Sequence, residues 1–401
     1  ASWWTRLPAD EYRRRPMQEV VISAFNLGLF GVVMVLAGFL GARLFDPTAG
    51  VVVAALLFGT EPLWHLANSG LPTLLLMVMV LVLVHLLVSF EREASQTPPR
   101  SGRLSALAAG CGLLVGLLFL TRYSFGLLAL PVTVYVAWRG VGHRFRVAGL
   151  ALVGVLLLAT PWIARNWQLS GTPFGTAGFA VLSGTESFPG DRLERSQNPQ
   201  LERGQAVEAV GKAVSNFRDW LRDDLIRLGG NWIAIFFVVG LLVPFGNPSL
   251  NRIRLLLVAM LLLLALAQAA GRTWVTTQFG NLTSENLAVA LAPVVFVFGT
   301  GFLLTLLDQV PWPAPVVRGL ALAGLVLAFS APFLLTILPP REFTLQDPPY
   351  RPRVILEFAD YTPQGTLFLS DIPWAVAWYG PRDCVWATLR VGENPEDNVS
   401  N

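Results

Sequence analysis

About ten apolar runs, each near the length of a membrane-spanning helix, occupy most of this sequence. A helix needs about 20 mostly apolar residues to cross the hydrocarbon core of a bilayer. Only 14% of the residues are charged, whereas soluble domains carry about 25%. We therefore expect an all-α polytopic membrane protein, in which the runs 124–138 and 231–246 are short for a full span. The expected spans are 18–43, 48–68, 71–90, 104–121, 124–138, 147–166, 231–246, 254–270, 286–307 and 316–338.

Arginine is concentrated in three loops between these runs, at 91–103, 139–146 and 247–254. With ten alternating spans the three loops fall on one side of the membrane, and their excess of arginine makes that side cytoplasmic. The long loop 167–230 and the tail 339–401 then lie together on the extracytoplasmic side.

The polar residues 1–17 fall on that outer side too, as the remnant of a first outer loop. Their basic run Arg13–Arg15 conflicts with this placement, because basic residues favour the cytoplasmic side. We therefore expect an upstream helix that is absent from this sequence, or a number of spans that is wrong by one.

Apolar side chains recur at helical spacing in the outer loop between 201 and 228. This pattern predicts an amphipathic helix lying on the outer membrane surface over the functional cavity. A helix that binds a partner protein is the alternative interpretation. The side chains expected to be buried in the membrane surface are Val210, Val214, Phe217 and Leu221.

The tail 339–401 has the pattern of a small α/β module outside the membrane. Residues 354–358, 366–369 and 385–389 read as strands. A helix is expected over 373–379, because Ser370 and Asp371 are capping residues and Pro373 suits the first turn.

Four positions with ionisable side chains are candidates for acid–base chemistry. Glu61 and His65 lie four residues apart on one expected helix and so share a face. Ionisable residues inside a membrane mark functional sites by default, although a mutually satisfied pair within the helix bundle fits this spacing equally well. Asp10 and Glu11 are the only acids before the first expected span.

Two further pairs of residues suit the binding of an anion at the outer face. Arg122 and Tyr123 lie in a tight hairpin between two spans, where a cation meets lipid phosphates. Arg165 and Asn166 end another span, beside tryptophans at headgroup level. A plain interfacial anchor is the alternative for Arg165.

Several motifs, taken in order, carry a resemblance to a known family. They are the segments Gly41–Phe45, Gly116–Tyr123 (GLLFLTRY), Pro161–Asn166 (PWIARN), Gly171–Phe174 (GTPF) and Ser370–Tyr379 (SDIPWAVAWY). With these motifs the chain resembles the membrane glycosyltransferases of the GT-C class, close to the protein mannosyltransferase and aminoarabinose transferase group (glycosyltransferase family 39-like). Arg122 stands where that group has a lysine.

The resemblance implies a fold of many helices in a bacterial inner membrane, with an active site at the outer face. It implies a sugar donor linked to a polyprenyl phosphate, which Arg122, Tyr123, Arg165 and Asn166 would bind. In that family a carboxylate on the first outer loop acts as the base. Asp10 and Glu11 lie too close to the first span to match that position well, so the catalytic acid is upstream of this sequence or has been lost.

The candidate residues also predict which side chains lie together in one site. We expect Arg122, Arg165 and Glu61 to line one cavity open to the outer leaflet, with His65 at its edge, because two guanidinium groups at the same depth are costly unless an anion or acids pair with them. Alternatives to a transferase are a non-catalytic subunit of a larger membrane complex and, less well supported, a transporter.

The sequence indicates no metal site, cofactor or nucleic-acid site. Cys111 and Cys384 have no disulfide or metal-ligand spacing. No cofactor is indicated, although a divalent metal stays open, and nothing indicates binding to nucleic acid.

Overall fold

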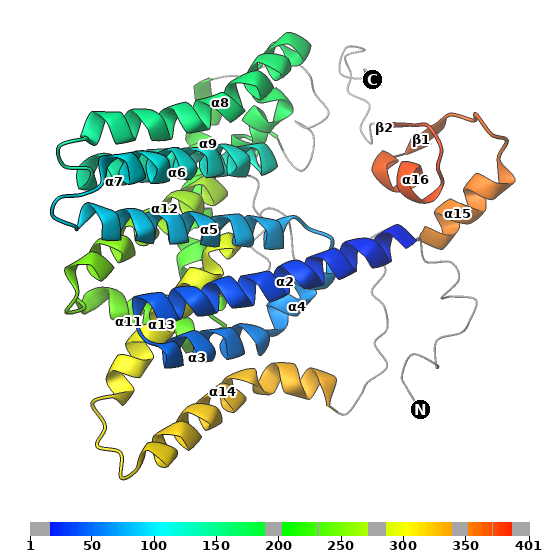
Figure 1. Ribbon diagram of the computed structural model, residues 1–401. Helices are drawn as coiled ribbons and strands as arrows, with labels where there is room; N and C mark the ends of the chain where they lie inside the picture. Colours follow the sequence, from blue (N-terminus) through cyan, green and yellow to red (C-terminus); the bar gives the residue numbers. More distant parts are fainter. Residues whose placement is uncertain are drawn as a thin grey trace.

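A computed structural model describes residues 17–188, 203–230, 232–271, 286–338, 352–370 and 372–386 of the protein. These residues form a bundle of helices followed by a short pair of strands (Figure 1). The elements are α2 (Met17–Leu44), α3 (Pro47–Phe58), α4 (Glu61–Asn68), α5 (Thr73–Ala94), α6 (Ser101–Thr121), η2 (Tyr123–Leu128), α7 (Ala129–Arg139), α8 (Arg144–Ser170), η3 (Gly175–Val181), α9 (Arg203–Asp219), η5 (Trp220–Asp224), α10 (Leu225–Leu228), α11 (Trp232–Leu242), α12 (Pro248–Ala270), η6 (Ala288–Leu291), α13 (Ala292–Leu307), α14 (Pro315–Ile337), α15 (Pro352–Tyr361), β1 (Phe368–Ser370), α16 (Pro373–Tyr379) and β2 (Cys384–Trp386).

The helices confirm a polytopic membrane protein. In the part of the chain described, 7 helices are long and apolar enough to cross a membrane, or up to 9 if each of two bent pairs forms one span. The expected number was about ten. The difference arises where helices are broken or short: α3 and α4 meet at a 62° bend, and η2 takes the first residues of the run 124–138, which leaves α7 with 11 residues.

The close packing of α6 against α8 positions the candidate site at the end of both helices. A Cβ atom added to Gly112 would lie 2.0 Å from the carbonyl oxygen of Ala151, and one added to Gly154 would lie 2.7 Å from the amide nitrogen of Leu113. Small residues of this kind let two helix backbones approach closely within a membrane. The two helices therefore hold a fixed register from one end of the bundle to the other.

The three arginine-containing loops meet at one end of the bundle, at the left of Figure 1. Glu91 of α5 contacts both Arg139 of α7 and Arg252 of α12 there. We call this the arginine-rich end. Helix α6 has 21 residues, and at about 1.5 Å per residue it carries the chain about 30 Å to the opposite end. The alternation expected from the loops is thus seen in the structure.

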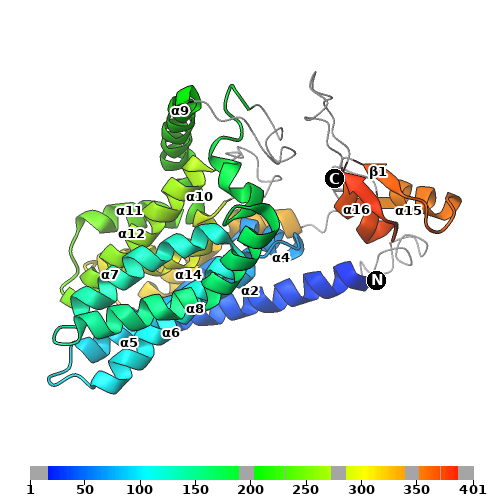
Figure 2. The same ribbon diagram turned by 90° about the horizontal axis from the view of Figure 1, so that it is seen from above.

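The segment expected to be an amphipathic surface helix is helical and is divided into α9, η5 and α10. It lies at the opposite edge of the bundle from α2 in the view from above (Figure 2). The amide nitrogen of the Asn216 side chain donates a hydrogen bond to the carbonyl of Ala269 at the end of α12 (3.0 Å). Three side chains of the expected apolar stripe are exposed and are not covered by the rest of the described protein: Val210, Val214 and Leu221.

Among the carboxyl-terminal elements, one expected strand is a helix and one expected helix is present. Residues 354–358, expected as a strand, belong to the helix α15, in which Ile355 and Ala359 share one face and lie close to Gly380. This four-residue spacing is helical, and it outweighs the β propensity of the β-branched pair Val354 and Ile355. Helix α16 covers 373–379 as expected, between β1 and β2, which pair in parallel. Residues 387–389 of the last expected strand lie outside the described part of the chain.

The orientation in the membrane is checked by labelling single cysteines. In a Cys384→Ser background, where Cys111 is buried, we expect Gln205→Cys to react with an impermeant maleimide added outside intact cells, and Thr97→Cys to react only after permeabilisation. The reason is that positions 97 and 205 lie at opposite ends of the bundle and the arginine-rich end is expected inside. The reverse pattern would place the arginine-rich end outside.

Candidate functional site

Tyr123 joins two segments that lie about forty residues apart in the chain. It opens η2, directly after Arg122, where the backbone leaves α6 in an extended conformation. The Tyr123 hydroxyl oxygen accepts hydrogen bonds from Trp162 Nε1 (2.7 Å) and Asn166 Nδ2 (3.0 Å). Trp162 and Asn166 lie four residues apart on α8 and therefore project from the same face of that helix.

Aromatic contacts extend this arrangement into the loop after α8. The helix ends at Gly171, whose φ of 68° is left-handed and therefore suits glycine. Asn166 Nδ2 also lies 3.3 Å from the Pro173 carbonyl oxygen, to which it donates. The ring of Phe174 then packs 5.7 Å from that of Tyr123. We call Tyr123, Trp162, Asn166 and Phe174 the Tyr123 cluster.

Two arginines adjoin the Tyr123 cluster. Arg165 is exposed and its guanidinium carbon lies 5.0 Å from the centre of the Trp162 ring, which is the geometry of a cation–π contact. Arg122 is half-buried and follows the last residue of α6. The structure therefore brings Arg122, Tyr123, Arg165 and Asn166 to the same end of one packed helix pair, where they can bind an anion.

Glu61 and His65 form a separate pair on α4. Their carboxylate and imidazole lie 3.5 Å apart, and both side chains are partly exposed. Helix α4 packs against α2, α3, α5 and α14, and Figure 1 shows α5 and α6 between α4 and α8. The structure thus does not place Glu61 and His65 beside the Tyr123 cluster, as the expectation of one shared cavity required. Asp10 and Glu11 lie outside the described residues.

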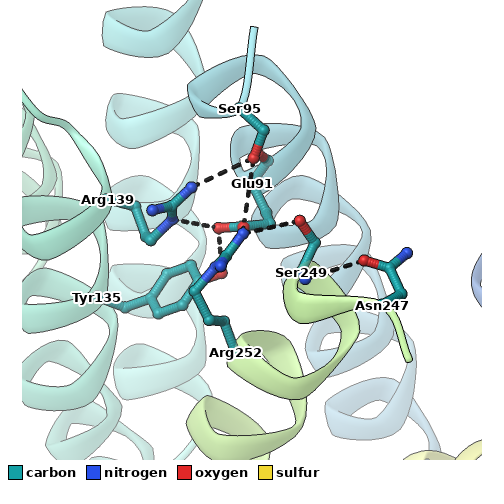
Figure 3. Close-up of polar contacts among 7 residues, drawn as sticks. All are labelled: Glu91, Ser95, Tyr135, Arg139, Asn247, Ser249 and Arg252. Carbon is teal, nitrogen blue, oxygen red and sulfur yellow. Dashed lines mark hydrogen bonds and ion pairs between the residues drawn. The ribbon is translucent and has the colours of Figure 1, made fainter. Parts of the chain in front are cut away.

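A buried ionic cluster at the arginine-rich end is shown in Figure 3. The side chain of Glu91 is 2% exposed. Its Oε2 atom accepts hydrogen bonds from the Tyr135 hydroxyl and from Arg139 Nε, both at 2.7 Å. Its Oε1 atom lies 2.6 Å from an outer nitrogen of Arg252. The Glu91 cluster, made of Glu91, Tyr135, Arg139 and Arg252, therefore ties α5, α7 and α12 together.

Sequence reasoning missed the Glu91 cluster because it treated the arginines as loop charges that set orientation. A usable signal was present in α5. Glu91 follows Val84, Leu87 and Val88 on the buried face of that helix, and a carboxylate on such a face requires cationic or hydrogen-bonding partners.

Asp224 is a second buried carboxylate that the sequence did not single out. It lies in η5 and is 5% exposed. The Nε2 atom of Gln268, on α12, donates a hydrogen bond to Asp224 Oδ2 (3.4 Å). The Oε1 atom of the same side chain accepts a hydrogen bond from the Ala288 backbone amide (3.2 Å). This contact links η5, α12 and η6 at the end of the bundle away from the arginine-rich loops.

Among the residues that the structure describes, no group of three or more His, Cys, Asp or Glu side chains is arranged to hold a metal ion.

Comparisons with known proteins add no relative. No protein-family model, no curated protein and no solved structure matches this chain.

Proposed function

We propose that this chain is a membrane glycosyltransferase of the GT-C type, which moves a sugar from a polyprenyl-phosphate donor to an acceptor at the extracytoplasmic face of a bacterial inner membrane. One observation carries the proposal. The hydrogen bonds from Trp162 and Asn166 to Tyr123 join two of the motif segments that carry the resemblance to that family. Separate motifs that meet in space are what a binding site requires.

The chemistry that such a site performs is a displacement at the anomeric carbon. The bond from that carbon to the phosphate oxygen breaks, a bond to the acceptor oxygen forms, and the acceptor proton passes to a carboxylate base. Negative charge grows on the departing polyprenyl phosphate, and cations placed at that point stabilise the transition state. Arg122 and Arg165 supply these cations in the proposal, because guanidinium groups bind phosphate through two parallel hydrogen bonds.

The base in this proposal is a carboxylate on the amino-terminal side of α2, where Asp10 and Glu11 are the acids of this sequence, although they lie closer to the first span than the base of the resembled family. Glu61 is less suitable, because α4 lies apart from α6 and α8. The Tyr123 hydroxyl accepts two hydrogen bonds from α8, so its part is to hold Asn166 and Trp162 in place. Trp162 in turn supports Arg165 through its ring.

A non-catalytic subunit on the same fold is the second candidate, and the exposed stripe of α9 is compatible with it. Three valines of the apolar stripe in the outer segment are largely exposed: Val207 is 75% exposed, Val210 64% and Val214 66%. A partner membrane protein would cover such a stripe, although a membrane surface would cover it as well.

The experiment compares binding with turnover. The purified protein is first titrated with decaprenyl phosphate and with decaprenol, which lacks the phosphate, and we expect only the phosphate to bind well. It is then supplied in proteoliposomes with decaprenyl-phosphate hexoses and pentoses, and release of decaprenyl phosphate is measured. Binding without release supports the non-catalytic subunit. Equal binding of the alcohol and the phosphate rejects the phosphate site and the transferase with it.

A further inference from the structure

A cavity of about 240 Å³ lies at the arginine-rich end, next to the Glu91 cluster. It is formed where α2 ends, α5 ends and α12 begins. Its lining includes the polar side chains of Arg43, Arg92 and Glu91 and the apolar side chains of Val88, Leu250 and Ile253. This cavity is at the opposite end of the bundle from the Tyr123 cluster, so the proposed transferase chemistry does not use it.

The two arginines of the wall are hydrogen-bonded to neutral groups. Arg43 donates through Nη1 to the His85 carbonyl (3.2 Å) and through Nη2 to the Ser89 hydroxyl (2.9 Å). Arg92 donates through Nη2 to the Arg43 carbonyl (2.7 Å). Each guanidinium has five N–H donors, so both keep donors and a full charge for a ligand.

Two acids near the end of α5, Glu91 and Glu93, are paired with other arginines. Glu91 already pairs with Arg139 and Arg252. One carboxylate and two guanidinium groups leave these three residues with a net positive charge, before Arg43 and Arg92 are counted. Glu93 pairs with Arg103 at 3.4 Å. The wall of the cavity is therefore positive at a place where Arg43 is half-buried, and charges in such surroundings favour a bound anion.

The start of α12 adds to the positive field. Asn247 caps this helix by accepting the Ser249 amide hydrogen through Oδ1 at 3.0 Å, and Asn247 and Ser249 both line the cavity. The amino-terminal end of a helix carries a partial positive charge and attracts anions.

We propose that this cavity binds the phosphate of an anionic phospholipid from the leaflet at the arginine-rich end. The lining favours a lipid over a soluble phosphate, because part of it is apolar and the cavity lies where membrane-spanning helices end. Its volume equals that of about eight water molecules, which accommodates a phosphodiester with its glycerol but not a whole lipid. The acyl chains would leave past Leu44, which is half-buried at the same cavity. Basic pockets between helices on the cytoplasmic side bind lipid headgroups in this way.

The test is lipid binding by the full chain, measured by native mass spectrometry from detergent. We expect dioleoyl phosphatidylglycerol to bind in preference to dioleoyl phosphatidylcholine. Arg92→Gln and Arg43→Gln should each weaken phosphatidylglycerol binding about fivefold. Arg146→Gln is the matched control: it removes one exposed arginine near the same end, outside the cavity, and should leave binding unchanged. Arg92 is exposed, so its variant should keep the wild-type unfolding midpoint.

Three results would overturn the proposal. The first is equal binding of phosphatidylglycerol by wild-type protein and Arg92→Gln. The second is an equal loss in Arg146→Gln, which would indicate general surface charge. The third is displacement of the lipid by an equal concentration of glycerol 3-phosphate, which would make the cavity a site for soluble phosphate.

Discussion

Replacing Glu91 with leucine is expected to lower the free energy of unfolding by about 3–5 kcal/mol, the usual cost of breaking a buried ion pair on one side. Glu91 is 1% exposed, and its carboxylate accepts hydrogen bonds from Tyr135 and Arg139, with Arg252 at its other oxygen. Without it, two guanidinium groups and a hydroxyl lose their common partner. Unfolding in mixed detergent micelles measures the change.

A matched control lies two residues further along the same helix. Glu93 is also 1% exposed, but within the described ranges it contacts the exposed Arg103 and the Arg100 backbone amide and no second guanidinium group. Glu93→Leu should therefore cost clearly less than Glu91→Leu. Equal losses in the two variants would mean that the Glu91 cluster has no special part in joining the helices.

A combined variant separates the cost of unpaired charge from the value of the cluster itself. Glu91→Leu together with Arg139→Leu and Arg252→Met removes the carboxylate and both of its cations. Replacing a whole buried ionic group by apolar side chains is often neutral or stabilising. We expect this triple variant to be more stable than Glu91→Leu alone.

Arg165→Ala is expected to reduce release of polyprenyl phosphate by about 100- to 1,000-fold, the effect of losing one preorganised group that stabilises transition-state charge. Its side chain is exposed and rests on the Trp162 ring. The cation–π contact of an exposed arginine contributes about 0.5–1 kcal/mol, so the unfolding midpoint should change little. Turnover and unfolding are measured on the same preparation.

Arg146→Ala is the control for Arg165→Ala, because it removes an exposed arginine from the first turn of the same helix α8, at the arginine-rich end. It should retain wild-type turnover. Arg165→Lys adds a second comparison, since lysine keeps the charge but cannot bind phosphate in the bidentate manner of arginine. If Arg165→Ala turns over normally, Arg165 is an interfacial anchor and the phosphate assignment fails.

The membrane class and the helices were readable from the sequence because they depend on local pattern. An apolar run of about 20 residues satisfies its own backbone hydrogen bonds as a helix in any bilayer. Alternation of such runs also determines which loops share an end, and the structure confirms this for the loops that carry Arg92, Arg139 and Arg252. A strand was wrongly expected where local signals compete, at Ile355, whose β propensity opposes the helical spacing of α15.

Only the tertiary structure decided which side chains meet. Arg252 and Glu91 are 161 residues apart in the chain, and Tyr123 and Asn166 are 43 apart. These pairs form because particular helix faces pack together, and the apolar helices are too uniform to show in the sequence which face meets which neighbour. For the same reason Glu61 resembled a site residue in sequence but lies on α4, apart from α6 and α8, whereas Glu91 resembled a loop charge but lies in the core.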